Sequence, residues 1–285
     1  MQMSNLIDGK AVAAKIRAEI KTKCEEIYLR DGKRPKLAIV FAGNNPASQI
    51  YVSSKEKACA EAGMESIVLR LPEDVTQKDL QKAVKDLCND ATVNGVMVQL
   101  PLPSGIDSKP VLESIPFEKD VDGLSSISAG RAFHDEKCLV PCTPKGIICL
   151  LKEYNVPLAG KHAVILGRSN LVGKPLSVLL LKENCTVTVC HSRTENLQSF
   201  TKSADILVSA VGKPCFINKD MVSPGATVID VGINRTENGL VGDVHDSVKE
   251  IAGLITPVPG GVGPMTVTML MLNTVEAYDY QRHNL

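Results

Sequence analysis

The sequence predicts an α/β protein of two domains with a cleft between them, and three observations lead to this prediction. Short apolar runs typical of buried strands alternate with longer amphipathic segments along most of the chain. A chain of 285 residues is long for one domain and comfortable for two. A glycine-rich turn near residue 167 joins an apolar run to a helical segment, as in a βαβ unit. Each domain is therefore expected to hold a parallel sheet covered by helices.

The elements of the first predicted domain, residues 1–141, follow one another closely. Val12, Ile16 and Ile20 recur at helical spacing after Asp8, and Gly32 to Pro35 ends the helix that they predict. The elements after it are a strand at 36–41, a helix at 46–62, a strand at 66–71, a helix at 76–89 and a strand at 95–99. The hydroxyl at position 76 suits an N-cap. Such alternation implies a parallel sheet.

The chain after residue 141 continues the alternation. We expect Thr143 to cap a helix that runs through Tyr154. The later elements are strands at 162–166, 186–190, 205–210, 227–231 and 254–255, with helices to 181 and at 265–280. The glycines and prolines of 257–264 argue against a helix before Met265. We therefore place a second domain at 142–264 and expect the final helix, 265–285, to pack back onto the first domain.

Composition excludes several classes of partner. The 32 basic and 32 acidic side chains balance, so no net charge attracts nucleic acid or an anionic membrane. The uncharged stretch 253–275 is too short in helical residues to span a membrane, and charges from Asp8 onward interrupt any signal-peptide apolar run. The nine cysteines include no C-x-x-C pair and the five histidines are scattered, so we expect no metal site and a reducing, cytoplasmic location.

The strand, glycine turn and helix around residue 167 indicate a Rossmann-like nucleotide-binding domain. Gly167, Arg168, Ser169 and Gly173 lie where backbone N–H groups at a helix N-terminus would face a pyrophosphate. The spacing is not the usual G-x-G-x-x-G, because Ser169 replaces the second glycine. A tight strand-to-helix turn without a ligand is the alternative interpretation.

The end of the next strand favours NADP over NAD. In such a unit, an acid at this position reads a free ribose 2′-hydroxyl and a basic residue reads a 2′-phosphate. The strand at 186–190 ends in His191-Ser192-Arg193, without a carboxylate. Ser192, Arg193 and Arg168 could bind the phosphate oxygens. Ordinary solvated polar residues remain the alternative.

Other polar residues suit proton transfer and ligand binding. Tyr51 and Lys55 lie one turn apart on a predicted helix, and burial can bring a lysine pKa toward the working pH. Gln99 ends a parallel strand, where ligands bind in open sheets. Asp122 could bind the N–H groups of an amidine-like heterocycle in a paired fashion, although Asp-Gly is also a common turn. The loop 256–266 allows close approach to a flat molecule.

Together, these motifs resemble the bifunctional methylenetetrahydrofolate dehydrogenase/methenyltetrahydrofolate cyclohydrolase (FolD-type) family over essentially the whole chain. The segments that carry the resemblance are Tyr51 to Lys55, Val98 to Pro103, Lys119 to Gly123, Pro141 to Pro144, Gly167 to Ser169 with Val172-Gly173, Gly232 to Asn234, and Pro257 to Thr266. Ser128 stands where the family commonly has asparagine, and Ala132 stands where a bulkier apolar residue is usual. These departures put an amide contact in doubt, not the activity.

The resemblance implies a role for each matching residue. Lys55 would be the catalytic residue, with Tyr51 and Gln99 positioning it and Asp122 anchoring the pterin ring. The residues implied for NADP are Gly167, Arg168, Ser169, Ser192 and Ile233, with Ile233 near the nicotinamide. The residues implied for the folate are Tyr51, Lys55, Gln99, Leu100, Pro101 and Asp122, together with Pro259, Gly260, Gly261, Gly263 and Pro264.

The resemblance also implies the reactions. A hydride leaves 5,10-methylenetetrahydrofolate for NADP⁺, and water then opens the methenyl cation to 10-formyltetrahydrofolate. A homodimer and a place in the one-carbon metabolism that serves purine biosynthesis are implied as well. The alternatives are a monofunctional dehydrogenase, an NADP dehydrogenase acting on another small substrate, and a non-catalytic NADP-binding regulatory module.

Overall fold

The computed structural model describes residues 5–237 and 239–283 and divides the chain into two compact units. Unit 1 consists of Thr143–Thr266 and the chain up to Ala14. Unit 2 consists of Lys15–Cys142 and the chain from Val267 onward. Both units contain parallel sheets flanked by helices, so the predicted α/β class is confirmed.

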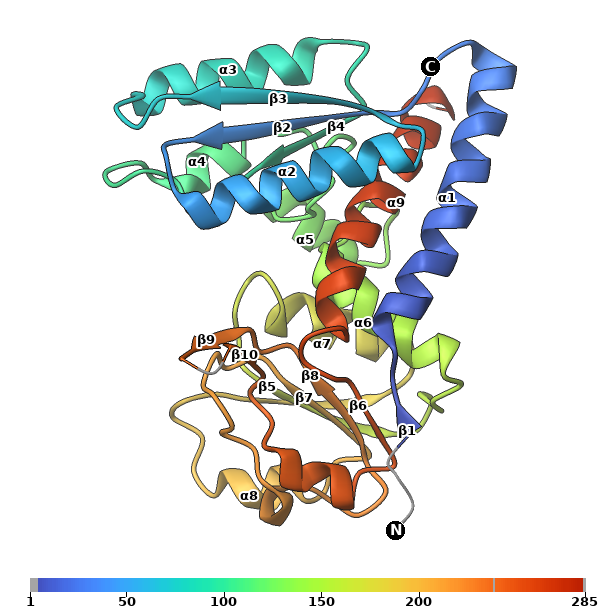
Figure 1. Ribbon diagram of the computed structural model, residues 1–285, viewed down its shortest axis with the longest axis vertical. Coiled ribbons are helices and arrows are strands. Elements are labelled where there is room, and N and C mark those ends of the chain that lie inside the picture. The colour runs from blue at the N-terminus through green and yellow to red at the C-terminus, as the bar shows by residue number, and fades with distance from the viewer. Residues whose placement is uncertain (1–4, 238, 284–285) are drawn as a thin grey trace. The chain divides into compact units, whose positions relative to one another are not determined.

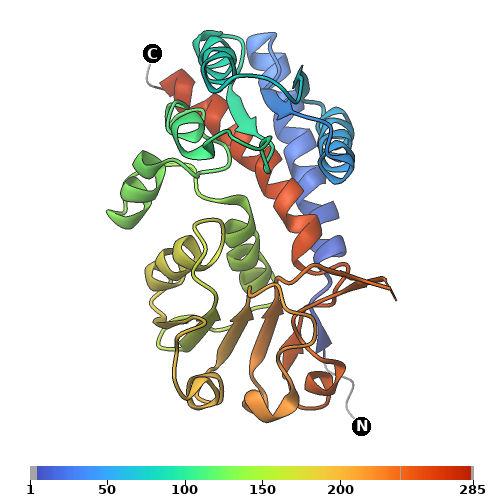
Figure 2. The ribbon, with the colours of Figure 1, turned by 90° about the vertical axis from the view of Figure 1, so that its left-hand side faces the viewer.

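The sheet of unit 2 has the strand order β3-β2-β4, with parallel pairing throughout. Its strands are β2 (Lys36–Ala42), β3 (Glu65–Leu71) and β4 (Gly95–Val98). Helices α2 (Pro46–Glu61) and α3 (Gln77–Asn89) lie on opposite sides of it (Figures 1 and 2). Ala38 and Val40 of the central strand pack with Leu80 and Val84 of α3, because alternate side chains of a strand share one face.

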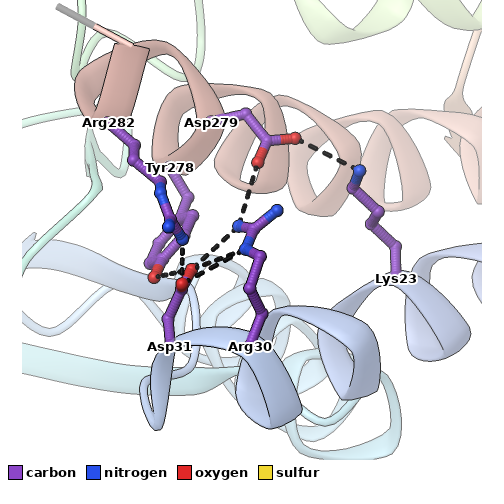
Figure 3. A network of polar contacts seen from close by, with 6 residues as sticks. All are labelled: Lys23, Arg30, Asp31, Tyr278, Asp279 and Arg282. Atoms are coloured by element: carbon purple, nitrogen blue, oxygen red, sulfur yellow. Dashed lines mark hydrogen bonds and ion pairs between the residues drawn. The ribbon is translucent and has the colours of Figure 1, made fainter.

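Further helices complete unit 2. They are α4 (Ser108–Leu112), α5 (Ser126–Phe133) and the parts of α1 (Gly9–Asp31) and α9 (Val262–His283) that belong to this unit. Figure 3 shows the polar network that joins the ends of α1 and α9. The Asp31 carboxylate accepts a 2.9 Å hydrogen bond from Tyr278 and pairs with Arg30 and Arg282. These partners hold the pKa of Asp31 well below its usual range, with Arg30 the main cause.

The sheet of unit 1 has the strand order β1-β11-β8-β7-β5-β6, again with parallel pairing (Figure 2). The strands are β1 (Asn5–Leu6), β5 (His162–Leu166), β6 (Thr186–Cys190), β7 (Ile206–Ser209), β8 (Thr227–Asp230) and β11 (Leu254–Ile255). Val164, Leu207 and Val228 form part of its core. Because the strands are parallel, the turns that follow β5, β6, β7 and β8 meet at one edge of the sheet.

Helices and a hairpin surround this sheet. The helices are α6 (Cys142–Glu153), α7 (Gly173–Lys182) and α8 (Leu197–Thr201), with short 3-10 turns at Lys219–Met221 and Asp246–Glu250. Strands β9 (Asn234–Thr236) and β10 (Gly239–Val241) form a separate antiparallel pair. The chain therefore leaves β8, makes this hairpin and returns toward the edge of the sheet.

Two predicted helix starts are wrong. The helix predicted to begin at a Thr143 cap begins at Cys142, and the Thr143 hydroxyl instead forms a 2.9 Å hydrogen bond with that of Thr266. The last helix begins at Val262 rather than Met265. Gly263 and Pro264 lie in its first turn, where a backbone N–H has no intrahelical partner and a proline is tolerated. Within the described ranges, no helix has the length and apolarity needed to cross a membrane.

Candidate functional site

A hydrogen bond in unit 2 joins Lys55 to Gln99. The Lys55 Nζ lies on α2 and donates to Gln99 Oε1 at 2.7 Å. Gln99 directly follows β4, is only 9% exposed, and uses its Nε2 to donate to the Leu100 carbonyl at 2.6 Å. The amide is therefore held at both ends, with its oxygen directed toward the lysine. These residues lie 44 positions apart in the sequence, and they meet because α2 packs on the sheet whose strand β4 ends just before Gln99.

Local sequence explains why α2 presents Lys55 in this way. Pro46 opens the helix, and the Asn45 side chain caps it by accepting a 3.0 Å hydrogen bond from the Ser48 amide. Tyr51 lies one turn before Lys55 and is 47% exposed. The structure places both residues on α2 but brings only the lysine to Gln99.

Asp122 belongs to the same group of titratable residues. Burial raises the pKa of its carboxyl, and the nearby Lys55 opposes that rise. Burial lowers the pKa of Lys55, and Asp122 opposes this shift. The Cys142 thiol lies 3.6 Å from Asp122 Oδ1. A partly buried amine beside a partly buried carboxyl and a neutral amide is an arrangement that can move a proton at neutral pH.

A buried carboxylate supports the turn that carries Asp122. Asp120 accepts hydrogen bonds from the Ser125 amide at 2.9 Å and from the Ser128 hydroxyl at 2.7 Å. Gly123 has a φ of +63°, and a Cβ there would lie 2.6 Å from the carbonyl carbon of Val140. The serine that departs from the family pattern is therefore a buried partner of Asp120, a role that the sequence did not indicate.

The other residues predicted for the folate in unit 2 follow Gln99 directly. Leu100 is half-buried and Pro101 is exposed, and the peptide bond between them is cis. The structure therefore brings Lys55, Gln99 and Asp122 together, and it places Leu100 and Pro101 at the same end of β4.

In unit 1, the turn after β5 requires glycine at two positions because neighbouring backbone atoms leave no room for a side chain. Gly167 has a φ of +115°, and a Cβ there would lie 2.5 Å from the Ala210 carbonyl oxygen. A Cβ on Gly173 would overlap the Gly167 carbonyl, so α7 can begin this close to the turn only with glycine. The Ser169 hydroxyl accepts a 3.1 Å hydrogen bond from the Val172 amide.

A cavity of about 410 Å³ lies at the edge of the sheet, beside this turn. It is lined by Leu166, Gly167, Arg168, Ser169, Cys190, His191, Ser192, Thr194, Leu197, Ala210, Val211, Lys213 and Phe216. Its polar groups are hydroxyls, an imidazole and two cations, and none of the described lining residues is acidic. This donor set fits a phosphate-bearing ligand.

Four of the residues predicted for NADP line this cavity: Gly167, Arg168, Ser169 and Ser192. Arg193 is exposed and is not among the lining residues of the cavity. Gly173 does not line the cavity either, but it packs against the Gly167 carbonyl of the turn. The cavity adds Lys213, which the sequence analysis missed. Lys213 follows a parallel strand, as Gln99 does, and this position could have predicted it as a ligand-binding residue.

Ile233 lies elsewhere in unit 1, on a second cavity of about 170 Å³. The lining residues of this cavity are Lys10, Asp230, Val231, Gly232, Ile233, Leu240 and Pro257–Pro264. The structure thus brings Ile233 together with the predicted folate residues Pro259, Gly260, Gly261, Gly263 and Pro264. A Cβ on Gly261 would lie 2.6 Å from the Pro257 carbonyl oxygen, which explains the glycine in this loop. Among the described residues, no group of His, Cys, Asp and Glu could hold a metal ion.

Two family models match the chain. The catalytic domain of tetrahydrofolate dehydrogenase/cyclohydrolase matches residues 7–122, and the NAD(P)-binding domain of the same family matches residues 141–282. The chain is 51% identical to the bifunctional protein FolD of Halalkalibacterium halodurans, with 95% of this chain and 98% of that protein covered. It is 52% identical to FolD of Exiguobacterium sibiricum, covering 96% and 99%.

Solved structures agree with these matches. The bifunctional FolD enzyme from Campylobacter jejuni superimposes with a TM-score of 0.96 at 46% identity, covering 98% of this chain and 99% of that one. The Trypanosoma brucei FolD, solved with NADP and an inhibitor, gives a TM-score of 0.93 at 38% identity and covers 99% of each chain. The resemblance inferred from the sequence motifs is confirmed: the chain belongs to the tetrahydrofolate dehydrogenase/cyclohydrolase family.

Proposed function

We propose that the chain is a bifunctional enzyme that oxidises 5,10-methylenetetrahydrofolate with NADP⁺ and hydrolyses the resulting methenyl compound to 10-formyltetrahydrofolate. The observation that carries this proposal is the 2.7 Å hydrogen bond between Lys55 and Gln99 beside Asp122, in a chain of this family. It supplies a base for hydrolysis and a carboxylate for the pterin in one place.

For hydrolysis, Lys55 acts as the base. Water adds to the one-carbon carbon of the methenyl cation, and the Lys55 amine takes one proton from that water to leave a neutral carbinolamine. The C–N5 bond of the carbinolamine then breaks as its hydroxyl proton passes to N5, which leaves the formyl group on N10. Burial lowers the pKa of Lys55, which enlarges the neutral fraction that can accept a proton. A cationic substrate beside the amine lowers it further. Tyr51 and Gln99 position Lys55, and Asp122 binds the pterin N–H groups.

For dehydrogenation, the protein binds and orients two flat rings, which is where most of the rate enhancement for such a transfer arises. Bound NADP⁺ supplies the hydride acceptor. Gly167, Arg168, Ser169 and Ser192 of the cavity wall would hold its phosphates together with Arg193, which lies outside the lining, and Lys213 would add a second cation to the wall beside Arg168. By the family resemblance, Ile233 would serve the nicotinamide, and Leu100, Pro101 and the loop from Pro259 to Pro264 would serve the folate. Ile233 and this loop line the same 170 Å³ cavity.

The folate chemistry belongs to residues 1–141 with the C-terminal helix, and nucleotide binding belongs to 142–264. We propose a homodimer in the cytoplasm that supplies one-carbon units for purine biosynthesis and has no nucleic-acid or membrane partner. The balanced composition supports the last point.

One measurement tests both activities. Purified protein is mixed with 5,10-methylenetetrahydrofolate and NADP⁺, and the absorbance of NADPH is followed together with that of the methenyl chromophore. We expect NADPH to appear and the methenyl compound, added separately without nucleotide, to decay. NADPH formation without decay would identify a monofunctional dehydrogenase. NADP binding without either reaction would identify a non-catalytic module or a dehydrogenase for another substrate, which thermal protection by folates would separate.

A further inference from the structure

Two buried carboxylates connect the loops at the edge of the unit 1 sheet. Asp230 is the last residue of β8, and Asp243 follows β10. Asp243 is fully buried and Asp230 is nearly so. Neither residue lines the 410 Å³ cavity, but Asp243 bonds to the 211–213 segment that does, and Asp230 bonds to the backbone of Asp243.

The Asp243 carboxylate accepts hydrogen bonds from the 209–213 segment and from Asn234 of β9. It accepts five hydrogen bonds: to Oδ2 from the Val211 amide at 2.8 Å, the Gly212 amide at 3.1 Å and the Ser209 hydroxyl at 3.2 Å, and to Oδ1 from the Lys213 amide at 2.9 Å and Asn234 Nδ2 at 3.0 Å. Three consecutive backbone amides therefore converge on one side chain. Two of these residues, Val211 and Lys213, form part of the cavity wall.

Asp230 in turn fixes Asp243. It accepts 2.9 Å hydrogen bonds from the backbone amides of Gly232, Asp243 and Val244. A Cβ on Gly232 would overlap the Asp243 carboxylate, and a Cβ on Gly242 would overlap that of Asp230. The chain thus packs glycines around both carboxylates, which leaves their oxygens free to accept the backbone amides.

We propose that Asp243 is a positioning residue for the nucleotide, holding the Val211–Lys213 loop in the shape that forms one wall of the 410 Å³ cavity. Asp230 orients it by fixing its backbone. This inference rests on the proposed binding of NADP in that cavity. A carboxylate is needed because it only accepts hydrogen bonds, whereas an amide in its place would direct N–H groups at backbone N–H groups.

The test compares Asp243→Asn with Asp205→Asn. Asp205 carries the same group in the same unit, but it is exposed and accepts a single backbone hydrogen bond, from His162, at the opposite edge of the sheet. The measurements are the KM for NADP⁺ in the dehydrogenase reaction, the Kd for NADPH by calorimetry, and the rate of methenyl hydrolysis without nucleotide.

We expect Asp243→Asn to raise the KM and the Kd tenfold or more while hydrolysis stays within twofold of wild type, because hydrolysis requires no nucleotide. Asp205→Asn is expected to leave all three values within twofold. An unchanged KM and Kd in Asp243→Asn, with normal NADPH binding by wild type, would overturn the positioning role alone. Wild-type protein that binds no NADPH would overturn the proposed function as well.

A second variant covers the case in which Asp243→Asn does not fold. Ser209→Ala removes one donor to Asp243 and keeps the carboxylate. We expect it to raise the KM for NADP⁺ at least threefold with unchanged hydrolysis, and an unchanged KM would overturn the proposal. A purely structural role for Asp243 would instead lower both activities together.

Discussion

Lys55 donates its hydrogen bond to the neutral side chain of Gln99, not to a carboxylate. A neutral acceptor orients the amine without strongly favouring its protonated form, whereas a carboxylate at 2.7 Å would hold the proton. Burial, which lowers the pKa of Lys55, is then opposed mainly by Asp122. The arrangement leaves the lysine both oriented and ready to accept a proton.

Replacement of Lys55 tests its role as the base. We expect Lys55→Met to lower methenyl hydrolysis by about 10²- to 10⁴-fold, the usual contribution of a positioned base, and to leave NADPH binding unchanged. Lys57→Met is the matched control, because Lys57 lies two residues further along α2 with its side chain exposed. Hydrolysis at the wild-type rate in Lys55→Met would show that the base lies elsewhere.

Replacement of Gln99 by glutamate tests the neutral acceptor. We expect Gln99→Glu to raise the pKa of Lys55, because the new carboxylate favours the charged amine. The neutral fraction at a given pH then falls, so the rising limb of the rate of hydrolysis against pH moves to higher pH. Rates measured across the pH range with saturating substrate would reveal the shift. A limb that stays in place while the rate falls uniformly would mean that Gln99 positions Lys55 without influencing its proton.

Much of the fold was predictable because its signals are local. The strands at 36–41 and 162–166 are apolar after their first residue, the strand at 186–190 alternates threonine with valine, and the structure confirms all three within a residue. The position of Gln99 after a parallel strand predicted that it faces the ligand-binding edge, whereas its pairing with Lys55 was implied only by the family resemblance. The paired strands β9 (Asn234–Thr236) and β10 (Gly239–Val241) carry no apolar alternation, so they were not predicted.

The buried carboxylates that support the loops could not be predicted, because their contacts join residues that are distant in the sequence. Asp230 and Asp243 lie 13 residues apart and meet only because the pairing of β9 with β10 folds the chain back. Asp120 was noted only as part of the segment Lys119 to Gly123, and its partner Ser128 was noted only as a departure from the family pattern. A buried carboxylate is stabilised by hydrogen-bond donors that are distant in the sequence, so the local composition does not reveal it.

The cations of the 410 Å³ cavity predict a nucleotide preference. We expect Arg168→Ala to raise the KM for NADP⁺ about tenfold or more and to change the KM for NAD⁺ much less, because a lost bond to a phosphate matters only when that phosphate is present. Arg193→Ala should have the smaller effect, since Arg193 is not among the lining residues. Lys202→Ala, an exposed cation of the same unit, serves as the control. Equal losses with both nucleotides would place Arg168 away from the 2′-phosphate.

The contact of Ser128 with Asp120 predicts a stability effect. Ser128→Ala removes a buried 2.7 Å hydrogen bond to a carboxylate, and we expect the free energy of unfolding to fall by about 1–3 kcal/mol. Ser53→Ala, at an exposed position of α2, should change it by less than about 0.5 kcal/mol. Urea unfolding monitored by circular dichroism measures both. A Ser128→Ala protein as stable as wild type would show that water replaces the lost donor.

Asp230 predicts a pH dependence of stability with a definite sign. Burial raises the pKa of its carboxyl from 3.8 to about 6, although three backbone amides oppose the shift. Between these values, the folded chain keeps a proton that the unfolded chain has released. The contribution of Asp230 to the free energy of unfolding therefore falls as the pH rises, by on the order of 3 kcal/mol from about pH 4 to about pH 7.

Comparison of wild type with Asp230→Asn across this range isolates that contribution. The stability of wild type relative to the variant should decline as the pH rises toward 6 and then level off, because asparagine does not titrate. Asp205→Asn gives the opposite sign: the His162 amide lowers the pKa of Asp205, so the wild-type advantage there is lost as the pH falls. Parallel stability curves for wild type and Asp230→Asn would mean that the backbone amides hold Asp230 ionised in spite of its burial.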